Sequence, residues 1–411
     1  MIRVSDLRNA RAEIASRIAN HCAHGPQSRG LPPEVKACGQ YLGPTDGGSG
    51  QRGVHGTAAA LRVLGSTEGS DARDLVPQLV RYLGDRLTIE KALRSEPDFL
   101  YFSRRLASED HNVIKLSETL YALSFVPPAV CSTEELVQRI AQQLLAGLQG
   151  DSGWTYFLDQ PGEAQVLPTA HAVRALARTG YDVAKPARWL LKRLSQTSGP
   201  SGAGHRADLS VRVYCLFVLA FSGIEHPPET RELKGLFKEL WRKLEPLMAD
   251  DVEQNVEYGR GDERYFVRVP WQLYLIPLAA KLSTLYRFAS LGVQGRLAAI
   301  LRSVGSPEGF IYPDSGYNCS ARTNAILFDS LALIEDHVSR HPWKVVPGMI
   351  WDGLRAVAGS RLATFGGIST AVVFAAVSVR QWIAVSGRLS DLAPEILVSA
   401  VVILLSARKP R

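Results

Sequence analysis

The sequence GWTY stands at residues 153–156 and is followed after a loop by PTAHAV at residues 168–173. A related pair occurs at residues 309–325, where GFIY leads after a similar loop into ARTNA. Near the N-terminus, a glycine-rich stretch leads into GTAAAL at residues 56–61. In each case glycine permits a tight turn, an aromatic side chain can fill the gap between adjacent helix pairs, and small residues let a helix approach its neighbours closely. These stretches predict a repeated unit of loop followed by helix.

Hydrophobic periodicity around these repeats is helical, and we expect no alternating strand of useful length. About twelve helices are predicted before residue 340, in two alternating sets. The strongly apolar set comprises Gly53–Leu64, Asn112–Phe125, Pro168–Thr179, Ala207–Phe221, Pro270–Leu285 and Arg322–Glu335. The more charged, amphipathic set comprises Ser5–Cys22, Ala72–Arg94, Thr133–Leu148, Lys185–Leu194, Glu229–Met248 and Gly292–Val304.

This alternation predicts an all-α fold in which an inner ring of apolar helices is covered by an outer ring of amphipathic ones. Six such pairs could close on themselves into an (α/α)6 barrel, and closure would remove the exposed ends that an open solenoid must cap. We assign this domain to residues 1–342.

The repeats resemble those of the terpenoid cyclase and protein prenyltransferase superfamily, whose α/α toroids include squalene cyclases. The resemblance implies a toroid over about residues 1–340, but the family's catalytic motifs do not carry over. The acidic DxDD motif is absent, and the cluster at residues 250–253 lacks the DDxxD register because Gln254 stands where the third acid should be. A prenyltransferase-like zinc site would have to use Asp208, Cys319 and His171, whose spacing does not single them out. We therefore expect no cofactor, no metal and no catalytic residues of this type.

A second resemblance concerns the segment Gly53-Val54-His55-Gly56, which is similar to a repeat of lanthionine cyclases. Those enzymes are also α/α toroids, and their zinc motif Cys-His-Gly is absent here. His55 is then expected to form hydrogen bonds at the start of its helix.

Candidate ligand-binding residues lie near the N-terminal ends of the predicted inner helices, which should face one mouth of the barrel. Several are cationic and several aromatic, and helix N-termini add positive partial charge, so a small anionic or phosphorylated ligand or an extended peptide would suit them. The alternative is that they pair with Asp and Glu across a filled barrel. The candidates are His55, Lys115, His171, Arg206, Asp208, Arg268, Trp271, Tyr274 and Arg322.

Charge and cysteine content exclude some classes of protein. The net charge of +7 is spread along predicted helices without a Lys/Arg run, which argues against a nucleic-acid partner. The five cysteines are widely spaced and form no CxxC pair, which predicts free thiols in a reducing compartment.

Composition changes sharply after residue 342, and residues 343–361 are interpreted as a linker. The uncharged segment Leu362–Val379 is long enough to span a bilayer, and Leu392–Ala407 is a shorter apolar segment. These segments predict a two-helix transmembrane hairpin over 362–407, and the basic residues flanking it predict a multi-pass protein of the inner membrane with the toroid in the cytoplasm. The alternative is that both segments are buried helices of the globular domain.

Small residues recur at helical spacing on one face of the first predicted span, at Gly367, Ala371, Ala375 and Ser378. Such a face permits close helix packing in lipid, either within the hairpin or between chains of a homo-oligomer.

Two functions remain open from the sequence. The first is a non-enzymatic, membrane-anchored toroid that binds a small anionic ligand or a protein partner, by analogy a sensor or effector at the membrane such as those of bacterial antiviral defence. The second is an isoprenoid-class enzyme, a cyclase or transferase acting on a lipid or prenyl diphosphate. An aromatic-lined apolar interior with convergent acids would favour the enzyme, and a filled or basic interior would favour the binding module.

Overall fold

A computed structural model gives the architecture of the chain. It describes residues 4–24, 36–39, 53–67, 69–88, 112–150, 152–158, 162–196, 205–223, 227–248, 254–260, 263–282, 291–304, 313–314, 318–319 and 321–340.

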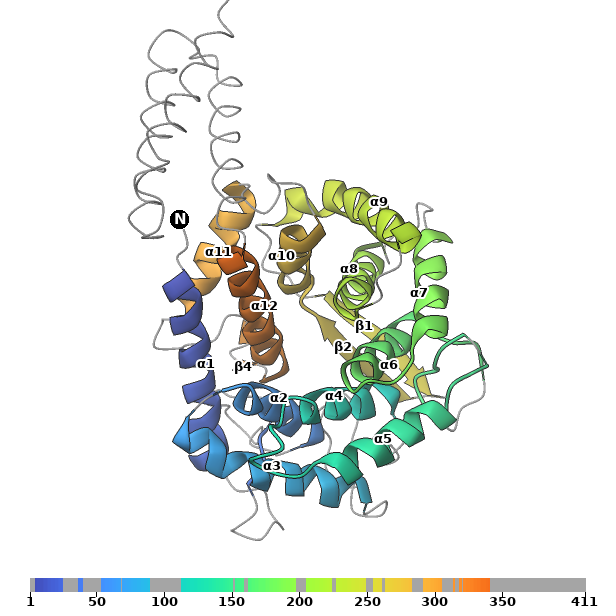
Figure 1. Cartoon of the computed structure of the whole chain (residues 1–411). Helices are drawn as coiled ribbons and strands as arrows, with labels where there is room; N and C mark the ends of the chain where they lie inside the picture. The colour runs from blue at the N-terminus through green and yellow to red at the C-terminus, as the bar shows by residue number, and fades with distance from the viewer. Residues whose placement is uncertain are drawn as a thin grey trace, which may run out of the picture.

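Two concentric rings of helices dominate the described residues (Figure 1). The inner ring consists of α2 (Val54–Gly65), α4 (Val113–Leu123), α6 (Val166–Arg178), α8 (His205–Phe221), α10 (Trp271–Leu282) and α12 (Ala321–Arg340). The outer ring consists of α1 (Val4–His24), α3 (Ser70–Thr88), α5 (Glu134–Ala146), α7 (Ala184–Gln196), α9 (Pro227–Leu244) and α11 (Leu291–Val304). The helical architecture therefore agrees with the expected all-α arrangement of alternating inner and outer helices.

Burial explains why the two sets of helices differ in composition. Every residue of α2 is buried, because outer helices cover it on one side and inner neighbours on the other. In α5 the buried residues are Leu136, Ile140, Ala141 and Leu144, a stripe that packs on α4 and leaves the opposite face polar.

The inner ring closes, because each of its helices contacts the next and α12 contacts α2. The first outer helix, α1, packs on both α12 and α2 and so covers this junction. Glu335 of α12 accepts hydrogen bonds from Arg8 and Arg11 of α1, with N–O distances of 2.5 and 2.9 Å.

A shared hydrogen-bond pattern joins two of the sequence repeats. Thr57, the fourth residue of α2, accepts a bond of 3.0 Å from the amide of Cys38. Thr169, the fourth residue of α6, accepts one of the same length from the amide of Trp154. The Trp154 ring is buried and donates from Nε1 to the carbonyl of Leu144, so the aromatic residue joins adjacent helix pairs as the sequence predicted.

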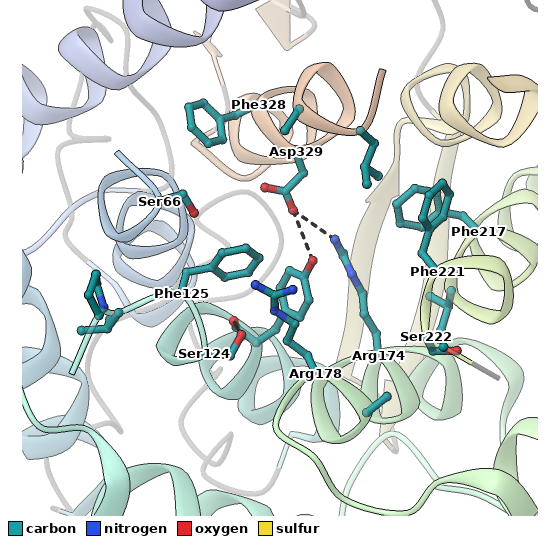
Figure 2. Close-up of a pocket in the computed structure, with 18 of the residues that line it drawn as sticks. Ser66, Ser124, Phe125, Arg174, Arg178, Phe217, Phe221, Ser222, Phe328 and Asp329 are labelled. Atoms are coloured by element: carbon teal, nitrogen blue, oxygen red, sulfur yellow. Dashed lines mark hydrogen bonds and ion pairs between the residues drawn. The ribbon is translucent and has the colours of Figure 1, made fainter. Parts of the chain in front are cut away.

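The expectation that the chain has no strand of useful length is wrong. Strand β1 (Gln254–Arg260) pairs antiparallel with β2 (Glu263–Val269), and this hairpin contacts α8 and lies behind the inner ring in both views (Figures 1 and 2). A smaller pair joins β3 (Pro313–Asp314) to β4 (Asn318–Cys319), and the short 3-10 helix η2 (Glu245–Leu247) follows α9. The alternation in β1 is weak in the sequence because polar residues occupy most of its positions.

The expectation of unpaired cysteines is also corrected. Cys22, near the end of α1, forms a disulfide with Cys38, and both are fully buried. The two are 16 residues apart in sequence, and such spacing does not reveal that the chain returns to bring their Cα atoms to 5.0 Å. Cys131 and Cys215 are free.

The membrane part of the predicted fold class requires correction. Among the described residues no helix is both long and apolar enough to cross a bilayer. The longest, α1 and α12 with 21 and 20 residues, carry charges along their length, and the apolar α10 has only 12 residues where about 20 are needed. This finding contradicts the transmembrane hairpin, and the inner-membrane location, the bilayer as a partner and oligomer contacts through membrane helices are not retained. The segment on which these expectations fall, including Gly367, Ala371, Ala375 and Ser378, lies outside the described residues.

Candidate functional site

The inner ring brings together one polar or aromatic side chain from each of its six helices. We call this group the axial cluster, and its members are His55, Glu118, His171, Tyr214, Tyr274 and Arg322. Glu118 accepts hydrogen bonds from Arg322 Nε at 2.5 Å and from His55 Nδ1 at 2.8 Å, and His171 Nδ1 lies 3.8 Å from it. The ring of Tyr214 lies 4.6 Å from that of His171 and 4.9 Å from that of Tyr274, between ring centroids.

Glu118 is the anionic centre of the cluster. Burial by itself would raise the pKa of its carboxyl, but the charge of Arg322 and the hydrogen bond from His55 outweigh burial, so the pKa of Glu118 lies well below its usual value. Glu118 is therefore ionised at neutral pH and holds α2, α4 and α12 together through charge-assisted hydrogen bonds.

His171 and Tyr214 are buried beside this centre. Burial lowers the pKa of His171 well below its usual value, and Arg322 and Arg174 lower it further, although Glu118 acts in the opposite direction. Burial also raises the pKa of Tyr214, so both groups are neutral at pH 7. His171 Nε2 and Tyr214 Oη have no hydrogen-bond partner among the described residues.

A second ionic group lies next to the axial cluster and is centred on Asp329 of α12. Its Oδ2 accepts from Arg62 Nε at 2.6 Å and from Arg174 Nη2 at 3.2 Å, and the Tyr121 hydroxyl lies 3.4 Å away. The Arg174 guanidinium also lies over the Tyr121 ring, 3.9 Å from its centroid. Two arginines thus share one carboxylate, which leaves this group with an excess positive charge.

A pocket of about 820 Å³ opens beyond Asp329, at the C-terminal ends of α4, α6 and α8 (Figure 2). Its cationic groups are Arg11, Arg174 and Arg178, and Asp329 is the acidic residue that lines it. Phenylalanines line the remaining walls, at Phe125, Phe217, Phe221 and Phe328.

Each of the three arginines of the pocket lies over an aromatic ring. Arg11 lies over Phe328 and Arg178 over Phe125, each 4.5 Å from the ring centroid, and Arg174 lies over Tyr121. Such contacts hold a guanidinium in place by its face and leave its edge N–H groups able to bind a ligand. Arg178 makes no ion pair within the described part of the chain.

Only some of the predicted ligand-binding residues belong to the axial cluster. His55, His171, Tyr274 and Arg322 meet in the cluster, and Lys115 and Trp271 are also buried. The side chains of Arg206, Asp208 and Arg268 lie outside what the structure describes. Pairing of His55 and Arg322 with Glu118 follows the alternative in which such residues meet acids across a filled barrel.

The open pocket lies at the other ends of the inner helices, and the sequence interpretation missed it. Arg174 and Arg178 are one turn apart on α6, and Phe217 and Phe221 are one turn apart on α8. Two cations at this spacing on a helix of the apolar set were the signal that could have located the pocket. Glu118 and Tyr214 were missed in the same way, since neither belongs to a motif.

No group of three or more His, Cys, Asp or Glu side chains among the described residues is arranged to hold a metal ion. Of the zinc candidates, His171 belongs to the axial cluster, whereas the side chains of Asp208 and Cys319 are not described.

Sequence comparison does not place the chain in a known family. The chain matches no protein-family model and no curated protein. The resemblance to terpenoid cyclases and prenyltransferases therefore stays a prediction.

Proposed function

We propose that this toroid is a non-enzymatic binding module whose pocket holds a small ligand with an anionic group and an apolar or aromatic body. The observation that carries the proposal is the set of three arginines, each over an aromatic ring, in one pocket of about 820 Å³. This volume lies in the range of roughly 300–1,000 Å³ typical of small-molecule sites.

The charges around the pocket favour an anion. Glu335 is shared by Arg8 and Arg11, and Arg178 has no acidic partner among the described residues. Each of these two groups therefore carries one more positive than negative charge. The phenylalanine walls supply apolar surface for the body of the ligand.

An isoprenoid-class enzyme is the second candidate, because a prenyl diphosphate has the same division into anionic and apolar parts. The only carboxylate that lines the described pocket, Asp329, is held by two arginines and is not positioned as a free acid. This arrangement favours binding over acid-initiated cyclisation. Incubation with geranylgeranyl diphosphate followed by mass spectrometry separates the two, since a binding module returns the compound unchanged.

The binding proposal is tested with two fluorescent probes that differ by one anionic group. We expect 8-anilinonaphthalene-1-sulfonate to bind more tightly than N-phenyl-1-naphthylamine, which lacks the sulfonate. Arg178→Gln should weaken binding of the sulfonate about tenfold or more, because a hydrogen bond to a charged group contributes about 1.5–3 kcal/mol.

Arg231→Gln, on the exposed face of α9, is the matched control and should change neither affinity. Binding of the uncharged probe should be similar in all three proteins, with circular dichroism confirming that each is folded. Equal loss of both probes in Arg178→Gln, or no loss of either, would contradict the proposed anionic site.

A further inference from the structure

A second, much smaller cavity lies between the axial cluster and the Asp329 group. Its volume is about 20 Å³, which is enough for about one water molecule or one monoatomic ion. The alanines Ala58 and Ala59 of α2 form one wall, and the other walls are polar or aromatic. Tyr121 and Arg174 line this cavity and the open pocket, so they separate the two spaces.

Two buried polar atoms of uncharged side chains in the walls of this cavity have no hydrogen-bond partner in the described structure. They are Ser117 Oγ and His171 Nε2, in residues that are 1% and 4% exposed. A buried polar atom without a partner is destabilising, and the usual explanation in a native protein is a bound water or ion. Both atoms can donate a proton to a hydrogen bond.

The charges decide between water and an ion. Three arginines line the cavity, Arg62, Arg174 and Arg322, and Glu118 is the acidic residue that lines it. The arginines are paired with two carboxylates, because Arg322 binds Glu118 while Arg62 and Arg174 share Asp329. Among the described residues, the group formed by Arg62, Arg174 and Asp329 therefore has one positive charge that is not compensated. An anion compensates this charge, whereas a water molecule does not.

We propose that this cavity binds one monoatomic anion of the size of chloride. Ser117 and His171 Nε2–H donate hydrogen bonds to it, and the three guanidinium groups provide the attractive field. Sulfate, phosphate and gluconate are too large for this space. The site is distinct from the open pocket, where the proposed ligand would meet Arg178.

Occupancy should depend on pH through His171. A protonated imidazole could donate from Nδ1 toward Glu118, 3.8 Å away, and from Nε2 toward the anion. Burial and the neighbouring arginines lower the pKa of His171 when the cavity is empty, and a bound anion opposes this effect. Binding is therefore coupled to proton uptake, and affinity should increase as pH falls toward 6.

The test measures the stability of the full chain by urea denaturation across a chloride series, with gluconate replacing chloride at constant ionic strength. At chloride concentrations above the Kd, the folding equilibrium constant should increase up to tenfold for each tenfold rise in chloride. Bromide should act like chloride. Ser117→Ala should weaken chloride binding about tenfold, so that the increase in stability begins at about tenfold higher chloride concentration.

Two control variants exclude other causes of a chloride effect. Ser330→Ala removes a buried serine of α12 that donates to Leu273 and does not line the cavity. Arg178→Gln removes the cation of the open pocket that has no described ion pair. Both should keep the full chloride dependence, and loss of this dependence in Arg178→Gln would place the anion in the open pocket instead.

A further measurement uses the unmodified protein and so does not depend on whether a variant folds. Crystals are grown in bromide, and the anion is located by anomalous diffraction. A bromide peak between Ser117 Oγ and His171 Nε2 is the expected result. A water molecule at that position, together with equal stability in chloride and gluconate, would overturn the proposal.

Discussion

At the scale of single residues, one carboxylate organises the centre of the molecule. Glu118 is contacted by Arg322 and His55 from two other inner helices, and its side chain is only 17% exposed. Removing one partner of such a buried pair leaves the others charged or polar without compensation, and this loss usually costs more than the pair contributes when intact.

We therefore expect Glu118→Gln to reduce the free energy of unfolding by about 3 kcal/mol or more, as measured by urea denaturation at pH 7. The glutamine keeps the size of the side chain, so the loss reports on charge. Glu135→Gln, on the exposed face of α5, should change stability by less than about 0.5 kcal/mol. A similar small effect for both variants would show that Glu118 is not a structural centre.

The stability of the protein should also depend on pH through His171. The pKa of His171 is lower in the folded protein than in the unfolded chain, so the unfolded chain binds more protons below the usual histidine pKa of about 6.5. Stability should therefore fall as pH decreases from about 7 to 5, before the carboxylates titrate. Because the pKa of Glu118 is also lowered, its contribution is present above the usual carboxyl pKa and is lost only at more acidic pH.

The measurement is a series of urea denaturations from pH 7.5 to 5 in gluconate buffers, so that chloride does not contribute. His171→Gln cannot titrate, and its stability should change less over this range. Identical slopes for the two proteins would mean that His171 is accessible to protons in the folded state.

The sequence predicted only part of the axial cluster. His55 and Arg322 were predicted because each stands at the start of an apolar helix near a repeat signal. Glu118 was not, because a glutamate inside a helix looks like any solvated charge until the ring closes around it. Pairing across 204 residues between Glu118 and Arg322 leaves no trace in local periodicity.

At the scale of elements, the segment 36–39 and helix α2 are joined through a close backbone contact. A Cβ atom at Gly56 of α2 would lie 2.3 Å from the carbonyl carbon and oxygen of Gly39 and 2.6 Å from the carbonyl oxygen of Cys38. The segment 36–39 is held there by the disulfide to Cys22 and by the bond from the Cys38 amide to Thr57. Backbone atoms cannot move aside as a flexible side chain could.

We expect Gly56→Ala to destabilise the protein by about 1–3 kcal/mol, the usual cost of overpacking, because α2 and this segment must separate. Gly235→Ala is the matched control, since a Cβ there meets nothing within 4 Å. Gly235 lies inside α9, where alanine should instead increase stability by about 0.5–1 kcal/mol. Thermal unfolding should show a lower Tm for Gly56→Ala and a higher Tm for Gly235→Ala. Stabilisation by Gly56→Ala would contradict the observed contact.

Element boundaries were predictable where the hydrophobic pattern was strong. The inner helix expected at Gly53–Leu64 is observed at Val54–Gly65, and the one expected at Ala207–Phe221 is observed at His205–Phe221. The β1–β2 hairpin was missed because seven-residue strands with mixed polarity give no clear period. The Cys22–Cys38 bond was missed because it depends on a tertiary approach.

At the scale of the whole molecule, the decisive property is ring closure. The last inner helix, α12, contacts α10 on one side and α2 on the other, and α1 covers the junction from outside. Helix α12 also supplies Arg322 to the axial cluster, Asp329 to the pocket and Glu335 to the contact with α1. The sequence predicted six pairs, but only the contacts between the first and last inner helices show that they close.

Two shortened chains should differ in how they unfold. A chain ending at residue 342 keeps every described helix and should unfold in one cooperative urea transition, because all the contacts of the ring are present. A chain ending at residue 320 lacks α12, and the faces of α2, α10 and α1 that pack on it would be exposed to water. It should keep helical far-UV circular dichroism but lose near-UV signal and cooperativity, because the remaining inner helices cannot close around a shared core. A cooperative, native-like transition in the shorter chain would show that the ring is stable when open, and aggregation of the longer one would show that residues after 342 contribute to the core.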